Sequence, residues 1–449
     1  MKIISYRYLP LNVYIVYSVF VLFSLLVGPM EYQGLDYLVL FSFVFVALLL
    51  FIIGFLAGAR GDYRKHLDLL KERLFAYRRV ERLVQGLLLL SVTAALLQWY
   101  FFVSAGVGVG FDSIGENYVA GYQGYERGQA SIDIMYVLNI FEQSLTLVVL
   151  LFCFYYFSVM GRFSRFAFIF VVVTYLLVNV LAAGKQKYLG DVVVLTLFCM
   201  VVNFAARGSR IKVSAVLAGI GLGCFVFLMF VEILRQRYQA AGINVGNIYE
   251  KVHPLIVWND NAWVLSVVSS DYALALGIFL GYFTNGLYGL YLSLTLPFEW
   301  TYFVGNSYSL GRIVEILFSA DGSVLEHTYP YRVGLAYGWG FDKWHSLFSW
   351  LASDITFLGV LLLTPIFSFF YARIWLQAVR ANNPFSGPLF IYFSMGLVFS
   401  YANNQIMHGL AGVLVLLVLF VGWCASRNTG GGPRASEIEL KRPYDEVAN

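Results

Sequence analysis

The chain has 449 residues, of which 60% are hydrophobic, 18% are aromatic and only 12% are charged. Soluble domains have roughly 45–50% apolar and about 25% charged residues, so this composition excludes a water-soluble enzyme and a disordered chain. It indicates a polytopic membrane protein. The formal net charge of +4 does not indicate a nucleic-acid partner, and in a membrane protein the distribution of Lys and Arg between the loops matters more than their total.

A helix needs about 20 mainly apolar residues to cross the hydrocarbon core of a bilayer. The sequence therefore predicts an all-α polytopic membrane protein with about ten transmembrane helices. They are expected at residues 11–28, 37–58, 84–105, 135–160, 166–183, 191–206, 213–234, 346–371, 385–402 and 406–424. The basic N-terminus leads into the first segment without a cleavage-site pattern, so this segment is expected to be a retained helix.

Residues 272–298 carry no charge and are also long enough to span. If they do not span, most of the 30 basic residues lie inside, and the positive-inside bias favours this topology over the alternative. Gly, Asn, Thr and Ser interrupt the apolar pattern, which is more typical of a broken or re-entrant segment that lies against protein at the outer surface. Both termini are then cytoplasmic.

This topology divides the chain into four parts. We expect helices one to seven in residues 1–234 with a small external loop at 106–134, a large external loop at 235–345, helices eight to ten in 346–426, and a disordered cytoplasmic tail at 427–449. Residues 63–84 alternate Leu with basic and acidic residues, which indicates an amphipathic helix on the anionic inner leaflet.

Few basic residues remain on the outer side: Arg127, Lys185, Lys187, Arg235, Arg237, Lys251, Arg312, Arg332 and Lys343. A guanidinium group is well matched to phosphate oxygens. The arginines at 235 and 237 stand where the seventh helix leaves the membrane, and the lysines at 185 and 187 stand at a tight outer turn. Both pairs are expected at the depth of the phosphate of a lipid-linked substrate. The alternatives are headgroup snorkelling or ion pairs with Glu232 or Asp191.

Aromatic residues are concentrated in or beside the large external loop. They are Trp258, Trp263, Trp300, Trp339, Trp344 and Trp350, with Tyr302, Tyr308, Tyr329, Tyr331 and Tyr337. Sugar rings pack their C–H faces on such rings, so we expect glycan contacts, with Trp339, Trp344 and Tyr329 among them. The alternative is an interfacial aromatic belt, although such a belt places aromatic residues at both faces of the membrane. In the first loop Tyr118, Tyr122 and Tyr125 precede Arg127, a further substrate-binding candidate.

No D-x-D, H-E-x-x-H, G-x-S-x-G or P-loop pattern occurs, and no external pair of acidic residues has a spacing suited to a divalent cation. The four cysteines lie in apolar stretches without C-x-x-C spacing, so we expect neither a disulfide nor a metal site. Chemistry without a metal or cofactor is expected. Arginines would then have to neutralise a leaving diphosphate themselves.

A polar cluster stands where the large loop re-enters the membrane, in GWGFDKWHSLFSWLASDITFLG. Asp342, Lys343 and His345 gather at the interface, and Asp354 follows nine residues after the histidine. An imidazole of near-neutral pKa can take a proton from an attacking hydroxyl or bond a leaving phosphate, whereas the alternative is a histidine that is merely hydrogen-bonded. Weaker candidates are His253, His327 and His408.

Taken together, the many spans, the late outer loop, the turn AAGKQK, the helix exit LRQRY and the re-entry WHSLFSWLASDITFLG resemble the O-antigen polymerases, the Wzy-type oligosaccharide repeat-unit polymerases. The resemblance implies a metal-independent, GT-C-type membrane glycosyltransferase of the bacterial inner membrane. Such an enzyme transfers a growing glycan from undecaprenyl diphosphate to a new lipid-linked repeat unit on the periplasmic face. The implied partners are the lipid-linked donor and acceptor, membrane lipids, a chain-length regulator and a flippase.

The resemblance also implies roles for individual residues. Arg235 and His345 would be catalytic, and Arg237 would help to hold the donor diphosphate. Supporting cations would be Lys187, Arg312 and Arg332. The chain departs from the family pattern with lysines in the turn after the fifth helix, where arginine is frequent, and lysine cannot make the bidentate contact.

Two other functions stay open. An O-antigen ligase uses the same donor and a similar fold but transfers the glycan to lipid A core, and the sequence does not identify the acceptor. A lipid-linked oligosaccharide flippase predicts short loops and a cationic path within the bundle. The leading expectation is a polymerase that acts by inverting displacement at the sugar carbon bearing the diphosphate.

Overall fold

The computed structural model describes residues 7–60, 69–104, 110, 113–119, 134–207, 213–244, 246–248, 252–318, 322–381 and 383–427. Its elements are α2 (Leu9–Val27), β1 (Met30–Tyr32), α3 (Tyr37–Gly58), α4 (Leu69–Ser104), α6 (Ile134–Tyr156), α7 (Arg162–Leu176), η2 (Leu177–Ala182), α8 (Lys187–Arg207), α9 (Val213–Ala240), β2 (Ile256–Trp258), η3 (Trp263–Val267), α11 (Ser270–Leu294), α12 (Tyr308–Leu317), η4 (Leu325–His327), α13 (Tyr329–Tyr337), α14 (Leu347–Arg380), α15 (Ser386–Phe399) and α16 (Leu410–Arg427).

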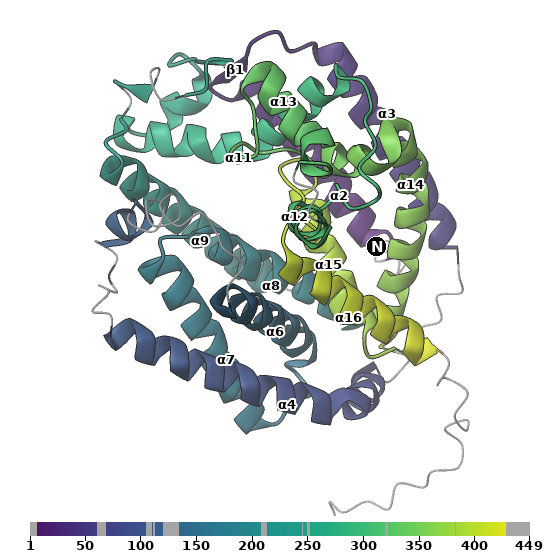
Figure 1. The fold of residues 1–449 in the computed structure, drawn as a ribbon. Coiled ribbons are helices and arrows are strands. Elements are labelled where there is room, and N and C mark those ends of the chain that lie inside the picture. Colours follow the sequence, from purple (N-terminus) through teal and green to yellow (C-terminus); the bar gives the residue numbers. More distant parts are fainter. Residues whose placement is uncertain are drawn as a thin grey trace, which may run out of the picture.

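The all-α membrane class is confirmed. Within the described residues, eight helices are long and apolar enough to cross a membrane, and the shorter α15 and α16 are also apolar. Each of the ten predicted spans corresponds to one of the helices in Figure 1. The number of helices that span, and the orientation of the bundle, stay predictions.

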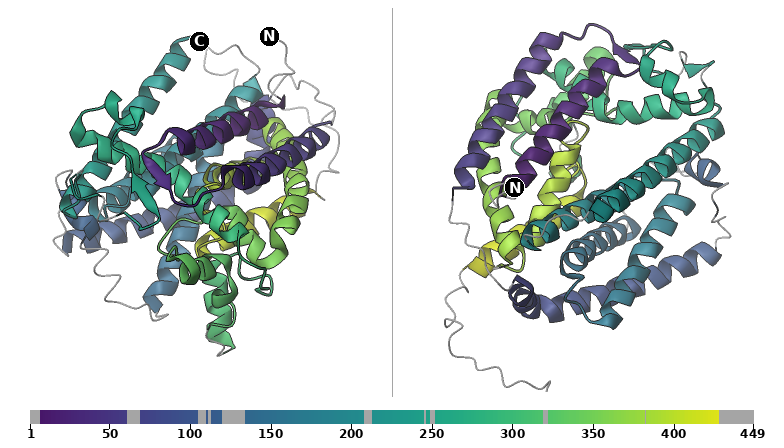
Figure 2. Two further views of the ribbon diagram at one scale, coloured as in Figure 1. Left: turned by 90° about the horizontal axis from the view of Figure 1, so that it is seen from above. Right: turned by 180° about the vertical axis from the view of Figure 1, so that it is seen from behind.

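The two ends of the bundle differ. In the right-hand view of Figure 2, the end of α3 and the start of α4 lie on one side, while β1 and the end of α9 lie on the other. The second side also carries α11, α13 and the β1–β2 pair, in which Tyr32 lies opposite Ile256. We call it the loop-rich end. It is the outer end in the topology expected from the sequence.

Close packing of α3 on α14 depends on two glycines one turn apart. A Cβ on Gly54 would lie 2.1 Å from the carbonyl oxygen of Pro365, and a Cβ on Gly58 would lie 2.3 Å from that of Phe369. Small residues at this spacing let two membrane helices approach closely and gain van der Waals contact. Beyond this pair, α14 bends at Thr356, which has a left-handed backbone (φ 65°) inside the helix.

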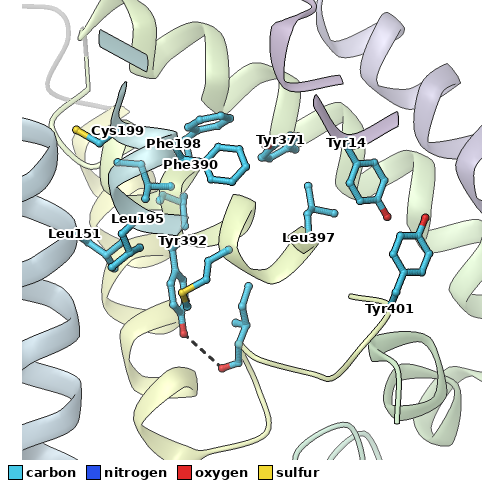
Figure 3. Close-up of a cluster of buried hydrophobic side chains, with 14 of the residues drawn as sticks. Tyr14, Leu151, Leu195, Phe198, Cys199, Tyr371, Phe390, Tyr392, Leu397 and Tyr401 are labelled. Carbon is cyan, nitrogen blue, oxygen red and sulfur yellow. Dashed lines mark hydrogen bonds between the residues drawn. The ribbon is translucent and has the colours of Figure 1, made fainter. Parts of the chain in front are cut away.

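The apolar core joins α2, α14 and α15 to α6 and α8, as Figure 3 shows. Phe390 lies between Phe198 and Tyr371, with ring centroids 6.2 and 5.1 Å away. Tyr14 and Tyr401 stack at 6.2 Å. These rings belong to helices far apart in the sequence, so the core fixes the relative position of the helices that carry the site.

The described part of the amphipathic helix expected at residues 63–84 is helical, and its place on the inner leaflet stays a prediction. Residues from Leu69 onward form one continuous helix with the following span, α4. Arg73 is buried, donates to the Asn203 side chain and lies 4.7 Å from the centre of the Tyr155 ring. Arg73 therefore has partners inside the protein, which the local alternation of residues does not reveal, whereas Arg78 and Arg82 are exposed.

The segment predicted at 272–298 forms one continuous helix, α11, rather than a broken one. Its length and composition allow it to cross a membrane. In its most apolar stretch of 18 residues, 72% is buried inside the protein, which is the highest share among the eight helices. A Cβ on Gly277 would lie 2.3 Å from the Trp258 ring, and one on Gly286 would lie 2.3 Å from the Tyr401 and Ala402 carbonyl oxygens. The helix thus packs against connections between other helices, in agreement with a segment that lies against protein.

Candidate functional site

Several helix ends converge at the loop-rich end, and the turn before α8 lies among them. The preceding helix ends in the π-helical turn η2, a feature found often at functional sites. Gly184 has φ +63°, and a Cβ there would lie 2.6 Å from Cβ of Tyr118. Only glycine combines this backbone with so close a contact. The turn therefore holds the short helical segment at residues 113–119 against the end of α9.

Arg237 lies in the last turn of α9, above this segment. Its guanidinium carbon is 3.4 Å from the centre of the Tyr118 ring, and its charge acts on the Tyr282 hydroxyl of α11. Gln186 donates to that hydroxyl at 3.1 Å, and the Trp344 ring lies edge-on to the Tyr282 ring at 5.2 Å. We call these five residues, together with Lys187, the α8–α9 cluster.

The partners of Arg237 are aromatic rings and neutral polar groups. Among the described residues, no carboxylate lies within ion-pair distance of this guanidinium. Cation–π contact orients a guanidinium without cancelling its charge. The cluster therefore keeps a positive charge available for an anion.

Lys187 begins α8 and is exposed. One turn later, Asp191 is buried and accepts from Nε2 of Gln405 at 3.1 and 3.4 Å. The lysine lies close enough to influence both Asp191 and His408 electrostatically. The connection between α15 and α16 thus meets the start of α8, and it brings amide side chains beside a cation.

Arg235 is only two residues from Arg237 but lies in a different environment. Its Nε and Nη2 atoms donate to both carboxylate oxygens of Glu232, at 2.9 and 2.6 Å, and Nη1 donates to Gln239. The alternative of an ion pair with Glu232 is therefore confirmed for this residue. Residues two positions apart in the sequence are separated by about 200° around a helix, so the two arginines point in different directions.

His345 is 1% exposed, and its Nε2–H donates to the carbonyl oxygen of Gly340 at 3.0 Å. Burial lowers its pKa to about 4, so the near-neutral pKa expected from the sequence is wrong and the imidazole is neutral at pH 7. Nδ1 has no hydrogen-bond partner and faces α11, where a Cβ on Gly289 would lie 3.0 Å away. The geometry matches the alternative of a hydrogen-bonded structural histidine.

Asp354 organises the loop before α12. Its buried carboxylate accepts from the Thr301 hydroxyl, from the backbone N–H groups of Gly305 and Asn306, and from the Asn306 side chain, at 2.5 to 3.0 Å. The loop between them includes two consecutive residues with positive φ, at 302 and 303. This acidic residue therefore holds a strained loop in place.

The other predicted cations have carboxylate partners. Arg312 lies 3.5 Å from Glu315, while Arg332 lies 2.9 Å from Glu299 and donates to the Pro297 carbonyl oxygen at 2.8 Å. The structure therefore does not bring these two arginines together with the α8–α9 cluster as unneutralised charges. Arg127 lies outside the described residues.

Two of the predicted glycan-contact residues are buried. Trp339 is 0% and Tyr329 3% exposed, so their rings pack inside the protein. Trp339 contacts the His253 and Tyr288 rings and donates from Nε1 to the Trp344 carbonyl oxygen. Of the three candidates, the half-buried Trp344 lies in the α8–α9 cluster, and Trp339 contacts its backbone.

An apolar cavity of about 360 Å³ lies between α2, α3, α14, α15 and α16. Exposed residues on α14 and α16, including Ile366, Phe370 and Phe420, line its rim, so it opens sideways where lipid would surround the helices. At the other end its lining includes Asn404 and Gln405. Through the bond of Gln405 to Asp191, this end adjoins the α8–α9 cluster.

Sequence reasoning missed the polar residues that connect these two features, Gln186, Tyr282, Asn404 and Gln405. A signal existed for the last two, because ANNQ places three amide side chains in a row between two apolar helices. No protein-family model, curated protein sequence or solved structure matches the chain.

Proposed function

We propose that the protein is a membrane glycosyltransferase that polymerises undecaprenyl-diphosphate-linked oligosaccharide repeat units on the outer face of the bacterial inner membrane. The observation that carries the proposal is the pairing of an apolar cavity with a cationic cluster. The cavity ends at Gln405, which bonds Asp191, and Lys187 lies one turn before that aspartate. A long apolar chain attached to a phosphate has this same arrangement of chemistry.

The lipid tail would enter between α14 and α16, and its diphosphate would lie at Lys187 and Arg237. The carbonyl and amide groups of Asn404 and Gln405 suit the boundary between tail and head group. Two cations stabilise a diphosphate more as it leaves than while it is attached, because negative charge builds up on it.

In the reaction, a hydroxyl oxygen of the acceptor sugar attacks the donor carbon that bears the diphosphate. The bond from this carbon to the diphosphate oxygen breaks, the hydroxyl proton passes to a base or to solvent, and undecaprenyl diphosphate leaves. The chain contributes orientation of the two lipid-anchored substrates and neutralisation of the leaving group. Arg237 supports this role better than Arg235, whose charge is shared with Glu232.

The test is Arg237→Gln in cells, with Arg312→Gln as the matched control because that arginine has a carboxylate partner at 3.5 Å. We expect the first variant to lose the ladder of polysaccharide lengths, at unchanged protein abundance, and to leave single repeat units on lipid A core. A normal ladder in the Arg237 variant would refute the proposal.

The same experiment separates the alternatives. Accumulation of long polymer on undecaprenyl diphosphate would instead identify a ligase, and accumulation of single units on the cytoplasmic side would identify a flippase. With purified protein, extracted lipid-linked repeat units should be converted to oligomers by the wild type and the Arg312 variant, at least 100-fold faster than by the Arg237 variant.

A further inference from the structure

A second cavity, of about 340 Å³, lies at the loop-rich end between the β1–β2 pair, α11 and α13. We call it the tyrosine pocket. Its lining residues are Gln33, Gly34, Leu255, Tyr288, Tyr291, Leu292, Thr295 and Tyr337. None of them is charged, and four bear a hydroxyl group. Its volume falls within the range of about 300–1,000 Å³ that is usual for small-ligand sites.

The pocket is built from segments that are distant in the sequence. The backbone N–H of Gln33 donates to the Leu255 carbonyl oxygen at 2.9 Å, and the Tyr288 hydroxyl donates to the Gln33 carbonyl oxygen at 2.8 Å. Gly34 has φ +69°, and a Cβ there would meet nothing within 4 Å. Glycine is therefore needed here for the backbone conformation of the turn and not for close packing. One wall of the pocket is backbone without a side chain at this position.

Tyrosine rings form the opposite wall. The Tyr288 ring stacks on Tyr32 at 4.7 Å and on Tyr291 at 6.3 Å, with interplanar angles of 28° and 22°. At the edge of this stack, the Thr295 and Tyr337 hydroxyls hydrogen-bond each other at 2.8 Å. The Thr295 hydroxyl donates to the Leu292 carbonyl oxygen at 2.7 Å, so the Tyr337 hydroxyl donates to Thr295 and keeps its oxygen as an acceptor. The wall therefore combines aromatic rings with hydroxyl oxygens that can accept from a ligand.

We propose that the tyrosine pocket binds one sugar residue of an uncharged glycan. A pyranose ring has a flat C–H face that suits an aromatic ring and a rim of hydroxyls that suits the threonine, tyrosine and glutamine groups. The absence of charge from the lining argues against a phosphate or a carboxylate-bearing sugar, because nothing there would neutralise it. The hydroxyls and backbone groups argue against a lipid tail.

The pocket is separate from the α8–α9 cluster but connected to it. The Trp339 ring lies edge-on to Tyr288 at 5.1 Å, its Nε1 donates to the Trp344 carbonyl oxygen, and the Trp344 ring contacts Tyr282. A glycan attached to a diphosphate in the cluster would have to pass Trp344 to reach the pocket. The assignment as a subsite for the lipid-linked glycan rests on the proposed function, whereas sugar binding itself does not.

The experiment uses the full-length protein in detergent and the repeat-unit oligosaccharide released by mild acid from the host's own lipid-linked pool. Binding is measured by saturation-transfer NMR. We expect Tyr291→Ala to weaken binding at least tenfold and Tyr337→Phe, which removes only a hydroxyl, to weaken it three- to tenfold. Tyr37→Ala, at the same end but outside the pocket, should bind as the wild type does.

Equal binding by the wild type and both pocket variants would overturn the proposal, as would no binding of the oligosaccharide to the wild type. Binding of sugar-free undecaprenyl diphosphate is measured in parallel and should be unchanged by the pocket variants. If the pocket variants lose the oligosaccharide but the wild type makes no polymer, the pocket stands and the proposed function fails. If the wild type makes polymer and the pocket variants bind the oligosaccharide normally, the proposed function stands and the assignment of the pocket fails.

Discussion

Two groups of cations at the loop-rich end differ in what surrounds them. Arg237 lies against the Tyr118 ring, and among the described residues no carboxylate forms an ion pair with Arg237 or Lys187. Arg312 and Arg332 each lie within 3.5 Å of a glutamate. The charge of the second group is therefore shared with carboxylates, and that of the first group is not neutralised by any described residue.

This difference shows that the number of outer cations is a poor guide to function. All four residues are cations that the sequence places on the expected outer side. What separates them is whether folding brings a carboxylate to them. The following variants test the contrast, from the largest expected effect to the smallest.

Asp354→Ala should have the largest effect, because the region around α12 is held by carboxylates. The substitution leaves the backbone N–H groups of Gly305 and Asn306 and the Asn306 side chain without this acceptor, whereas the Thr301 hydroxyl keeps the Ser353 carbonyl oxygen. A loss of about 3 to 5 kcal/mol in unfolding free energy is expected, seen as a lower unfolding temperature. Asp342→Ala, at an exposed aspartate, serves as the control. Similar unfolding temperatures for the two variants would contradict a structural role for Asp354.

Acidification should destabilise the region between the two groups, where His345 and His408 lie. Burial lowers the pKa of each to about 4, below the usual value of 6.5; Lys187 lowers that of His408 further, and Asp342 opposes the shift for His345. The unfolded chain then binds more protons than the folded one between pH 6.5 and 4. Stability is therefore complete above pH 6.5 and falls as the pH drops towards 4.

The measurement is the unfolding temperature in detergent across this pH range. In the double variant His345→Gln and His408→Gln, a neutral amide replaces each imidazole, so the fall between pH 6.5 and 4 should be shallower than in the wild type. Parallel curves for the two proteins would show that carboxylates alone cause the pH dependence.

Tyr118→Leu should weaken the α8–α9 cluster without affecting the α12–α13 region. The variant removes the ring beneath Arg237 and keeps the charge. A cation–π contact of about 1 kcal/mol corresponds to roughly a fivefold loss of affinity for undecaprenyl diphosphate, measured by titration of the purified protein. Affinity equal to that of the wild type would mean that the ring does not orient the guanidinium.

Arg312→Gln should have the smallest effect. Its guanidinium is 49% exposed, and Glu315 keeps two backbone hydrogen bonds, from Val324 and Leu325, after the arginine is lost. We expect a change in unfolding free energy within about 0.5 kcal/mol. A loss of lipid-diphosphate binding in this variant would remove the distinction between the two groups of cations.

The helices were predictable to a large extent, because hydropathy over 20 residues depends on the local sequence alone. The boundaries were less so: the seventh predicted helix continues past residue 234 to Ala240, and Arg235 and Arg237 are helical rather than part of a loop. For the candidate site, the sequence singled out the turn before α8 and the exit of α9, which the structure brings together through Tyr118. It could not show that Gln405, more than 200 residues later, reaches Asp191.

The amino-acid sequence alone determined the membrane class, the helical segments and the small set of basic residues between them, because these follow from the side chains of each segment and their transfer from water to lipid. Tertiary structure decided which of two arginines in LRQRY meets a glutamate, that His345 is buried and neutral, and that an apolar cavity ends at Gln405, which bonds Asp191. Charge pairing, burial and cavities depend on neighbours that are remote in the chain, so no local pattern encodes them.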